Sequence, residues 1–226
     1  MAREDVFANA AADYESWFET PLGSYLDRQE LGAAEAVLPA ASEGGDVVEV
    51  GAGTGHVVRF LAERGYRLTA VEPSEAMRLV GGESTKGLDV SWVDAVGEAL
   101  PFEDGQFDGA VYFATIEFVD DPGRALAEAL RVVRPGGWLA VGYLHALSPW
   151  AALYRYLAEQ GNEPWTAARF FVRDGLTGLV GSEPVASAQA GWLAPMAEEP
   201  FEAADEAGKR AGNMPAFEVL LWRKTG

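Results

Sequence analysis

Short apolar runs alternate with amphipathic segments through the middle of the chain. The runs are rich in Val, Ala, Leu and Phe and predict buried strands, while the segments between them carry apolar residues at helical spacing. Strands that alternate with helices at this rhythm predict βαβ units and a parallel sheet. We expect strands over residues 46–50, 67–71, 89–93, 107–113 and 138–144, with helices over 55–64, 74–80 and 122–133.

The two flanks of this alternating region have a different pattern. Residues 1–43 read as helical, with a break at Thr20-Pro21-Leu22-Gly23 and an end at Pro39. No internal repeat or low-complexity linker interrupts the chain, so the pattern predicts one α/β domain over residues 1–226. After residue 145 we expect helices over 149–160 and 167–181, a weak strand over 184–193, an acidic helix over 198–211 and a strand over 216–223.

Composition narrows the classes of protein that fit this pattern. The 226 residues are 49% hydrophobic and 11% aromatic, which is enough for the core of one domain. The absence of cysteine excludes disulfides, cysteine nucleophiles and thiolate metal sites. Because the chain has only two histidines, we expect no metal site.

The charge and the apolar runs bear on partners and location. A formal net charge of −18 would repel a phosphate backbone, so we expect no nucleic-acid partner. No window reaches the roughly 18 apolar residues of a membrane span, and the first residues carry acids without a continuous apolar run. We therefore expect a cytoplasmic protein without a membrane partner.

The first strand of the alternating region ends in a glycine-rich loop. Glu49 is followed by Gly51, Gly53 and Gly55, and then by a helix. Ligands bind at the carboxyl ends of parallel strands, glycine lets a ligand approach the backbone, and a helix start favours an anion. A dinucleotide fingerprint needs Gly or Ala where this chain has His56. The loop predicts a ligand other than a dinucleotide; a tight turn without a ligand is the alternative.

Acids and carbonyl groups at the next strand ends add to this site. Glu72 ends the second strand, where its carboxylate can accept both hydrogen bonds of a ribose diol, or cap the helix after Pro73. Asp94 ends the third strand and can accept from an adenine amine while the backbone N–H of Ala95 binds a ring nitrogen, or it is a surface acid. The backbone carbonyls near Phe113, at the end of the fourth strand, can hold an ammonium group.

Four segments in this order resemble successive motifs of class I small-molecule methyltransferases that use S-adenosylmethionine. They span residues 49–55, 99–102, 106–111 and 130–139, and the resemblance runs continuously over 46–144. It implies a Rossmann-like, seven-stranded, mostly parallel sheet of order 3-2-1-4-5-7-6 with an antiparallel last strand, helices on both faces and an N-terminal helical lid. It also implies S-adenosylmethionine as cofactor and S-adenosylhomocysteine as product. The expected cofactor-binding residues are Tyr14, Glu49, Gly51, Ala52, Gly53, Gly55, Glu72, Pro73, Asp94, Ala95 and Phe113.

The same resemblance divides the domain into parts. Residues 1–43 would form the lid, 46–144 the cofactor-binding core, 145–183 a helical insertion over the acceptor, and 184–226 the closing strands. Tyr14 would then contact the cofactor or pack the lid against the core. The aromatic residues between positions 150 and 171 would line an acceptor pocket or belong to the core.

Methyl transfer from a sulfonium depends mainly on alignment and on the exclusion of water. A general base is needed only where the acceptor must lose a proton. His145, just after the fifth strand, is the candidate base because imidazole titrates near neutrality. Glu117, just after the fourth strand, is a second candidate, and either residue can instead be a polar loop residue.

The expected function is methyl transfer to a small-molecule acceptor, by in-line displacement. The sequence leaves open whether oxygen, nitrogen or carbon is methylated, and it leaves the oligomeric state open. A non-catalytic regulator that binds S-adenosylmethionine is one alternative, and a dinucleotide-dependent oxidoreductase is another. A synthase that modifies the cofactor itself would need more basic residues near the site than the loops show.

Overall fold

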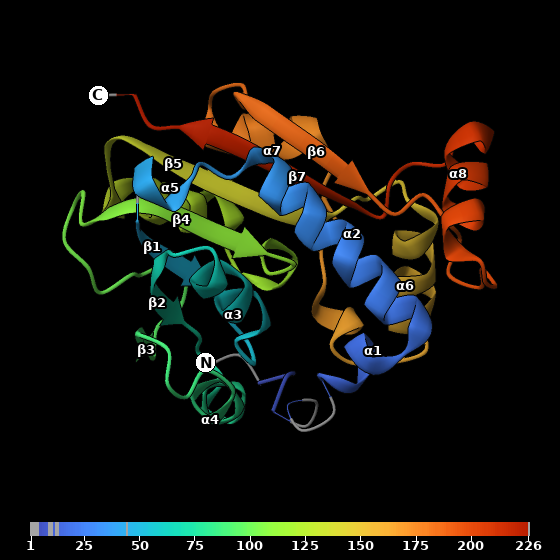
Figure 1. Cartoon of the computed structure of the whole chain (residues 1–226), viewed down its shortest axis with the longest axis horizontal. Coiled ribbons are helices and arrows are strands. Elements are labelled where there is room, and N and C mark those ends of the chain that lie inside the picture. Colours follow the sequence, from blue (N-terminus) through green and yellow to red (C-terminus); the bar gives the residue numbers. More distant parts are fainter. Residues whose placement is uncertain (1–4, 9–10, 12–13, 44, 226) are drawn as a thin grey trace.

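A computed structural model describes residues 5–8, 11, 14–43 and 45–225, and shows one sheet with helices on both faces (Figure 1). Its seven strands lie in the order β3-β2-β1-β4-β5-β7-β6, which confirms the expected fold class. The neighbours from β3 to β5 pair in parallel, and β7 pairs antiparallel with both β5 and β6. The strands are β1 (Asp46–Val50), β2 (Arg67–Val71), β3 (Val90–Val93), β4 (Phe107–Phe113), β5 (Val133–Leu144), β6 (Ala186–Ala190) and β7 (Phe217–Arg223).

Helices α3 (His56–Glu63), α4 (Glu75–Ser84) and α5 (Pro122–Val132) connect the parallel strands. Several helices start at a side chain that accepts a backbone N–H, as Asp121 does from Arg124 at 3.0 Å, with proline next in the chain. Outside the parallel core lie α1 (Ser16–Glu19), α2 (Pro21–Val37), α6 (Pro149–Glu159), α7 (Arg173–Val180), α8 (Phe201–Ala211) and the short turns η1 (Ala41–Glu43), η2 (Ile116–Phe118) and η3 (Trp165–Ala167).

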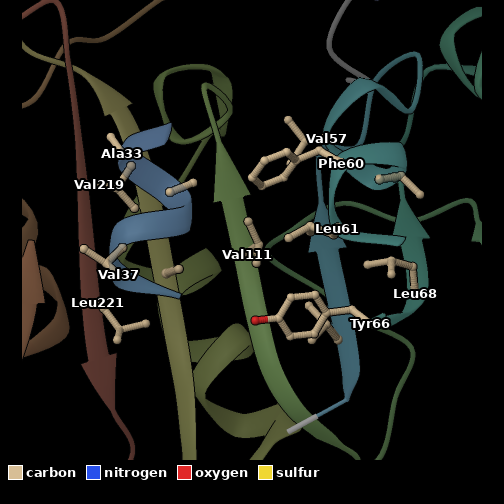
Figure 2. Packing of buried hydrophobic residues seen from close by; sticks show 14 of the residues in the cluster. Ala33, Val37, Val57, Phe60, Leu61, Tyr66, Leu68, Val111, Val219 and Leu221 are labelled. Carbon is tan, nitrogen blue, oxygen red and sulfur yellow. The ribbon is translucent and has the colours of Figure 1, made fainter. Parts of the chain in front are cut away.

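The two faces of the sheet are covered by different helices. On one face, apolar residues of α2 and α3 pack on β1, β4, β5 and β7. In Figure 2, Val37 lies over Val219 and Leu221 on one side of this layer, and Phe60 lies beside Val111 on the other. On the opposite face, α5 and α7 pack on the alternate residues of the same strands. Burial of both faces explains why the parallel strands read as continuous apolar runs.

A third apolar cluster joins the lid to the helical insertion. Tyr25 and Leu26 of α2 pack with Trp150 of α6 and Leu193, which follows β6. Trp17 of α1 meets Trp150 edge-on, with ring centroids 6.1 Å apart. Helix α1, from the chain before β1, and helix α6, from the chain after β5, therefore lie together beyond the carboxyl ends of the parallel strands (Figure 1).

Some element boundaries differ from the sequence predictions. Strand β5 begins at Val133 rather than 138, because residues 135–137 form a bulge within the strand, with a register shift between Phe107 and Gly109 of β4. Helix α4 continues to Ser84 instead of ending at residue 80, because Gly81 lets Trp92 pack where a Cβ would lie 2.2 Å from its ring.

Two further predictions, both for helical segments, were too long. Helix α7 begins at Arg173 rather than 167, because Phe171 makes a β-bridge with His145. In the lid, α1 is a single turn at Ser16–Glu19, and residues 1–4, 9–10 and 12–13 of the predicted lid lie outside the described residues. Within the described ranges, no helix combines the length and apolar character that crossing a bilayer requires.

Candidate functional site

The loop after β1 turns through three left-handed glycines. Gly51, Gly53 and Gly55 have φ values of +75°, +54° and +80°, a region that side chains disfavour. The N–H groups of Gly51 and Ala52 donate to the carbonyl oxygen of Val71 at 2.7 and 3.0 Å, which ties the loop to the end of β2. Gly55 then forms the N-cap of α3. The loop is held by the sheet itself.

Gly51 and Gly53 differ in what surrounds them. A Cβ on Gly51 would lie 2.0 Å from Cγ2 of Thr115, so this position admits only glycine. A Cβ on Gly53 would meet nothing within 4 Å. The backbone at Gly53 is therefore open to the approach of a ligand, as the sequence predicted for this loop.

Glu72 lies beside this open backbone. Its Oε2 accepts the N–H of Gly53 and its Oε1 accepts the N–H of Ser74, both at 2.9 Å. The residue is only 7% exposed, and burial raises its pKa against the lowering effect of these two N–H groups. The carboxylate is thus fixed in place between the ends of β1 and β2, and Pro73 next to it is exposed.

Glu49 is the more unusual acid of this site. The residue is 2% exposed, and its Oε2 has no hydrogen-bond partner among the described residues. Burial, and then the negative charge of Glu72, raise its pKa well above the usual range. An unpartnered carboxylate oxygen inside a protein is costly unless a proton or a cation compensates it. The carboxylate oxygen of Glu49 is therefore suited to accept a hydrogen bond from the ammonium group of a ligand.

The third strand contributes an exposed acid. The Asp94 side chain is 70% exposed and pairs with Nη2 of Arg78 at 2.9 Å, while Ala95 is partly buried. Nη1 of Arg78 donates to the backbone carbonyl of Glu72 at 2.6 Å. Arg78, which the sequence did not single out, joins the ends of β2 and β3 from its place on α4.

The end of β4 completes the edge. Phe113 packs against Phe217 of β7, with ring centroids 4.6 Å apart. Ala114 has φ +49°, an unfavourable conformation for a residue with a Cβ, and such conformations concentrate at functional sites. The Thr115 hydroxyl lies 3.1 Å from the carbonyl oxygen of Gly51 and 3.0 Å from that of Phe113, so it links the ends of β1 and β4.

The lid is fastened to α3 by a group of side chains, here called the latch: Glu15, Phe18, Asp27, His56 and Arg59. Nε2 of His56 lies 2.7 Å from Oδ1 of Asp27, and the Phe18 ring stacks on the imidazole at 4.1 Å. Arg59 donates to Glu15 at 2.9 Å. His56 is thus engaged with lid residues, and the first turn of α3 carries the lid over the glycine loop.

Tyr14 stands next to the latch. Its ring meets Phe18 edge-on at 5.9 Å, and 38% of the residue is exposed. Its role as a cofactor contact stays a prediction. The latch itself escaped the sequence reasoning, since Glu15 and Asp27 look like any surface acids of a helical segment.

The two candidate bases have different surroundings. His145 is 4% exposed, its Nδ1 accepts the N–H of Leu147 at 3.3 Å, and burial lowers its pKa. Glu117 is fully buried, its Oε1 accepts the N–H of Leu144 at 2.6 Å, and burial raises its pKa to about 7. Both assignments remain predictions, but only Glu117 keeps an unpartnered oxygen, Oε2, among the described residues.

Metal chemistry has no counterpart in the described part of the chain. Those residues include no group of three or more His, Asp or Glu side chains arranged to hold a metal ion. The polar groups brought together at the strand ends are carboxylates, backbone amides and carbonyl oxygens. This set suits a polar organic ligand with hydroxyl and ammonium groups.

Comparisons with known proteins agree with this geometry. Residues 48–141 match the model of a family described as a methyltransferase domain. A crystal structure from Thermotoga maritima, described as a SAM-dependent methyltransferase and possible histamine N-methyltransferase, is 29% identical, with a TM-score of 0.77, and the match covers 97% of this chain and 99% of that one.

Curated relatives match over a shorter stretch. An uncharacterised protein of Mycobacterium tuberculosis is 32% identical over 161 residues, which are 71% of this chain and 53% of that protein. A demethylmenaquinone methyltransferase of Clavibacter sepedonicus is 35% identical over 112 residues, which are 49% of this chain and 45% of that enzyme. The chain thus spans about half the length of the curated relatives it matches.

Proposed function

The chain belongs to the class I methyltransferases that use S-adenosylmethionine, and from this premise we propose that it methylates a small-molecule acceptor and releases S-adenosylhomocysteine. One observation carries the proposal. The buried carboxyls of Glu49 and Glu72 flank the open backbone at Gly53, at the carboxyl ends of β1 and β2. That is the place where ligands bind in sheets of this kind.

Each part of the cofactor has residues that fit it. Glu72 accepts the ribose hydroxyls, and Asp94 with the backbone of Ala95 binds the adenine. The ammonium group compensates the unpartnered oxygen of Glu49, and the backbone carbonyls near Phe113, at the end of β4, bind the same group. S-adenosylmethionine supplies an electrophilic methyl group on a sulfonium. The residues of the chain orient the acceptor and exclude water.

A small-molecule acceptor is supported by the lid and by the relatives. The latch holds the lid residues Glu15 and Asp27 against α3, next to the glycine loop. The names of the Thermotoga and Clavibacter proteins refer to histamine and demethylmenaquinone, both small molecules. The net charge of −18 disfavours nucleic acid as acceptor.

The same proposal includes the division of residues 1–226 into lid, cofactor core, helical insertion and closing strands, and a cytoplasmic location. Against an oxidoreductase, His56 occupies the position of the third fingerprint glycine and is engaged with Asp27. A non-catalytic binding protein would share every cofactor contact, so only turnover separates it from an enzyme.

Calorimetry with S-adenosylhomocysteine tests the cofactor site. We expect binding by the wild-type chain and a loss of about 1–3 kcal/mol in the Glu72→Ala variant, because ribose hydroxyls lose their acceptor. Glu83→Ala, which removes an exposed acid from α4, the helix that follows Glu72, is the matched control. No heat of binding at millimolar ligand would refute the proposal. Binding without methyl transfer to any acceptor in a labelled-cofactor screen would favour the regulator.

A further inference from the structure

Glu117 offers a carboxylate oxygen that the protein does not use. The residue lies in η2, directly after β4, and is 0% exposed. Its Oε1 accepts the N–H of Leu144, whereas its Oε2 has no partner in the part of the chain that the structure describes. A buried acceptor without a hydrogen bond lowers the stability of the folded protein. Oε2 of Glu117 can therefore accept a hydrogen bond from a ligand.

Glu30, on the lid, interacts electrostatically with Glu117. It lies on α2 and is partly buried, and burial, followed by the charges of Asp27 and Glu117, raises its pKa to about 8. The effect of Glu117 on this pKa shows that the two carboxyls lie close enough to interact. Asp27 is engaged with His56, while Glu30 has no hydrogen bond or ion pair within the described residues.

Two tyrosines connect this pair of acids with the cofactor side. Burial, then Glu30 and then Tyr14, raise the pKa of the Tyr154 phenol on α6. Although 38% of Tyr14 is exposed, the pKa of its phenol is raised by burial and then by four acids, among them Glu30, Glu72 and Glu117. The phenol of Tyr14 thus interacts electrostatically both with Glu72, at the cofactor edge, and with Glu30 and Glu117.

Aromatic rings cluster around Tyr154 and beside Phe118, the neighbour of Glu117 in the chain. The Tyr154 ring stacks on Trp165 with centroids 3.7 Å apart, and Phe170 lies 6.1 Å from Tyr154. Phe118, next to Glu117 in the chain, lies 6.2 Å from Trp165. Ring faces attract cations, and carboxylates do so more strongly. Acids and rings together form a surface suited to a positive group with an apolar body.

The nearby cationic side chains are occupied elsewhere. Arg59 pairs with Glu15 in the latch, Arg155 lies over the Phe170 ring, and Arg169 donates to the backbone carbonyls of Val119 and Asp120. None of them is among the groups that act on the pKa of Glu30 or Glu117. Within the described residues, the pKa of neither carboxyl is lowered by the charge of a protein cation.

We propose that the methyl acceptor is an amine, whose nitrogen is bound by Glu30 and Glu117 and whose apolar body packs against Tyr154 and Trp165. This inference rests on the proposed function, since it names the class of molecule that receives the methyl group. It makes Glu30 and Glu117 the residues that determine acceptor specificity. An acceptor carboxylate would meet two acidic groups at this place, and an alcohol would bring no positive charge to stabilise their ionised forms.

The chemistry of the pair fits an amine that arrives as an ammonium ion. The ammonium gives one proton to Glu117 or Glu30, whose pKa values near neutrality make that transfer feasible. The neutral nitrogen then forms a bond to the methyl carbon as the carbon–sulfur bond breaks, and the sulfur keeps that bonding pair. The product leaves as a methylated ammonium, and the carboxyl returns its proton to water.

Calorimetry with matched amines and alcohols tests the inference on protein saturated with S-adenosylhomocysteine. Suitable probes are 2-phenylethylamine with 2-phenylethanol, and butylamine with butanol. We expect each amine to bind at least about tenfold more tightly than its alcohol. Glu30→Gln and Glu117→Gln should each remove about tenfold of amine affinity and leave the affinity for S-adenosylhomocysteine within about twofold. Glu35→Gln, on the exposed face of the same α2, is the control.

Each contrary result has a defined meaning. Equal binding of amines and alcohols, or no binding of amines at millimolar concentration, overturns the inference. So does an equal loss of S-adenosylhomocysteine affinity in both variants, because the two acids would then serve the ammonium of the cofactor. If Glu117→Gln does not fold, Glu30→Gln on the lid decides the question.

Turnover separates this inference from the proposed function on which it rests. With labelled S-adenosylmethionine, methyl transfer to amines and not to the matched alcohols is expected. Transfer to alcohols alone would overturn only the amine inference. Failure to bind S-adenosylhomocysteine would overturn the proposed function first.

Discussion

The proposed cofactor edge is shaped mainly by backbone groups, whereas the proposed acceptor side is formed by side chains. At the ends of β1 and β2, backbone groups dominate: left-handed glycines shape the loop, and the N–H groups of Gly53 and Ser74 fix Glu72. On the acceptor side, the pair Glu30–Glu117 and its aromatic surroundings are side chains brought from α2, η2, α6 and η3. The first arrangement is local in the sequence, and the second depends on the tertiary fold.

This difference indicates which groups determine the ligand specificity of each region. Glu72 is already partnered by backbone before any ligand arrives, so the cofactor edge is preorganised, which lowers the cost of binding. Glu30 and one oxygen of Glu117 have no partner within the described residues. On our proposal, the acceptor side therefore depends mainly on the positive charge of its ligand, and substitution of a few side chains would change its specificity.

The largest expected effect would break the cofactor edge at its backbone. Gly51→Ala should prevent folding or cost more than about 3 kcal/mol of unfolding free energy, because the new Cβ would overlap Thr115 in a left-handed conformation. Gly53→Ala should cost only about 1–2 kcal/mol, since its Cβ meets open space. Urea unfolding of both variants measures the contrast.

Gly53→Ala also sharpens the comparison in a binding experiment. The added methyl group would occupy the space left for the ligand, so S-adenosylhomocysteine should bind at least about tenfold more weakly to a folded variant. Retained affinity in Gly53→Ala would place the ligand away from this loop. Gly82→Ala, on α4, also meets open space and controls for a simple loss of glycine.

An effect of intermediate size is expected in the pH dependence of the stability of the apo protein. Burial raises the pKa of Glu49 above its unfolded value, so the folded state holds a proton that the unfolded state has lost. This contribution to stability is complete below the unfolded pKa and disappears as the pH rises through the folded one. Melting temperatures of the apo protein should therefore fall as the pH rises from weakly acidic to weakly alkaline.

Glu49→Gln removes this titration and should raise the alkaline melting temperature by about 2–4 °C, the shift that 1 kcal/mol produces in a chain of this size. Scanning calorimetry across the pH range makes the measurement. Glu63→Gln removes one charge from an exposed position of α3 and should leave the slope unchanged. An unchanged slope in Glu49→Gln would mean that Glu49 is ionised in the apo protein.

The smallest effect concerns the latch, where the two regions meet. His56→Ala removes the stack on Phe18 and the bond to Asp27, and should weaken S-adenosylhomocysteine binding by about 1 kcal/mol, since partly exposed contacts of this type contribute little. Arg64→Gln breaks the Arg64–Glu35 pair between the same two helices, far from the loop, and is the control. Equal effects of both changes would show that the latch has no special part in holding the lid.

Sequence reasoning reached the cofactor edge because its signals are local. The glycine spacing, the acids at strand ends and the alternation of strands and helices lie within short windows, and the sheet order followed from the family resemblance. The boundaries failed where tertiary contacts decide: Trp92 lets α4 run past Gly81, and the pairing of Phe171 with His145 delays α7. Glu30 gave no local signal, because only the fold brings it to Glu117 from the other side of the cofactor core.

The place of β7 between β5 and β6 has a consequence for synthesis. The core from β1 to β5 is joined by short crossovers, so it can assemble while the rest of the chain is still being made. Helix α2 is made before any of the seven strands, yet Val37 packs on Val219 and Leu221 of β7, the strand that follows all the others in the chain. Its apolar face thus stays uncovered longest on the nascent chain, and a product truncated before β7 would be prone to aggregate.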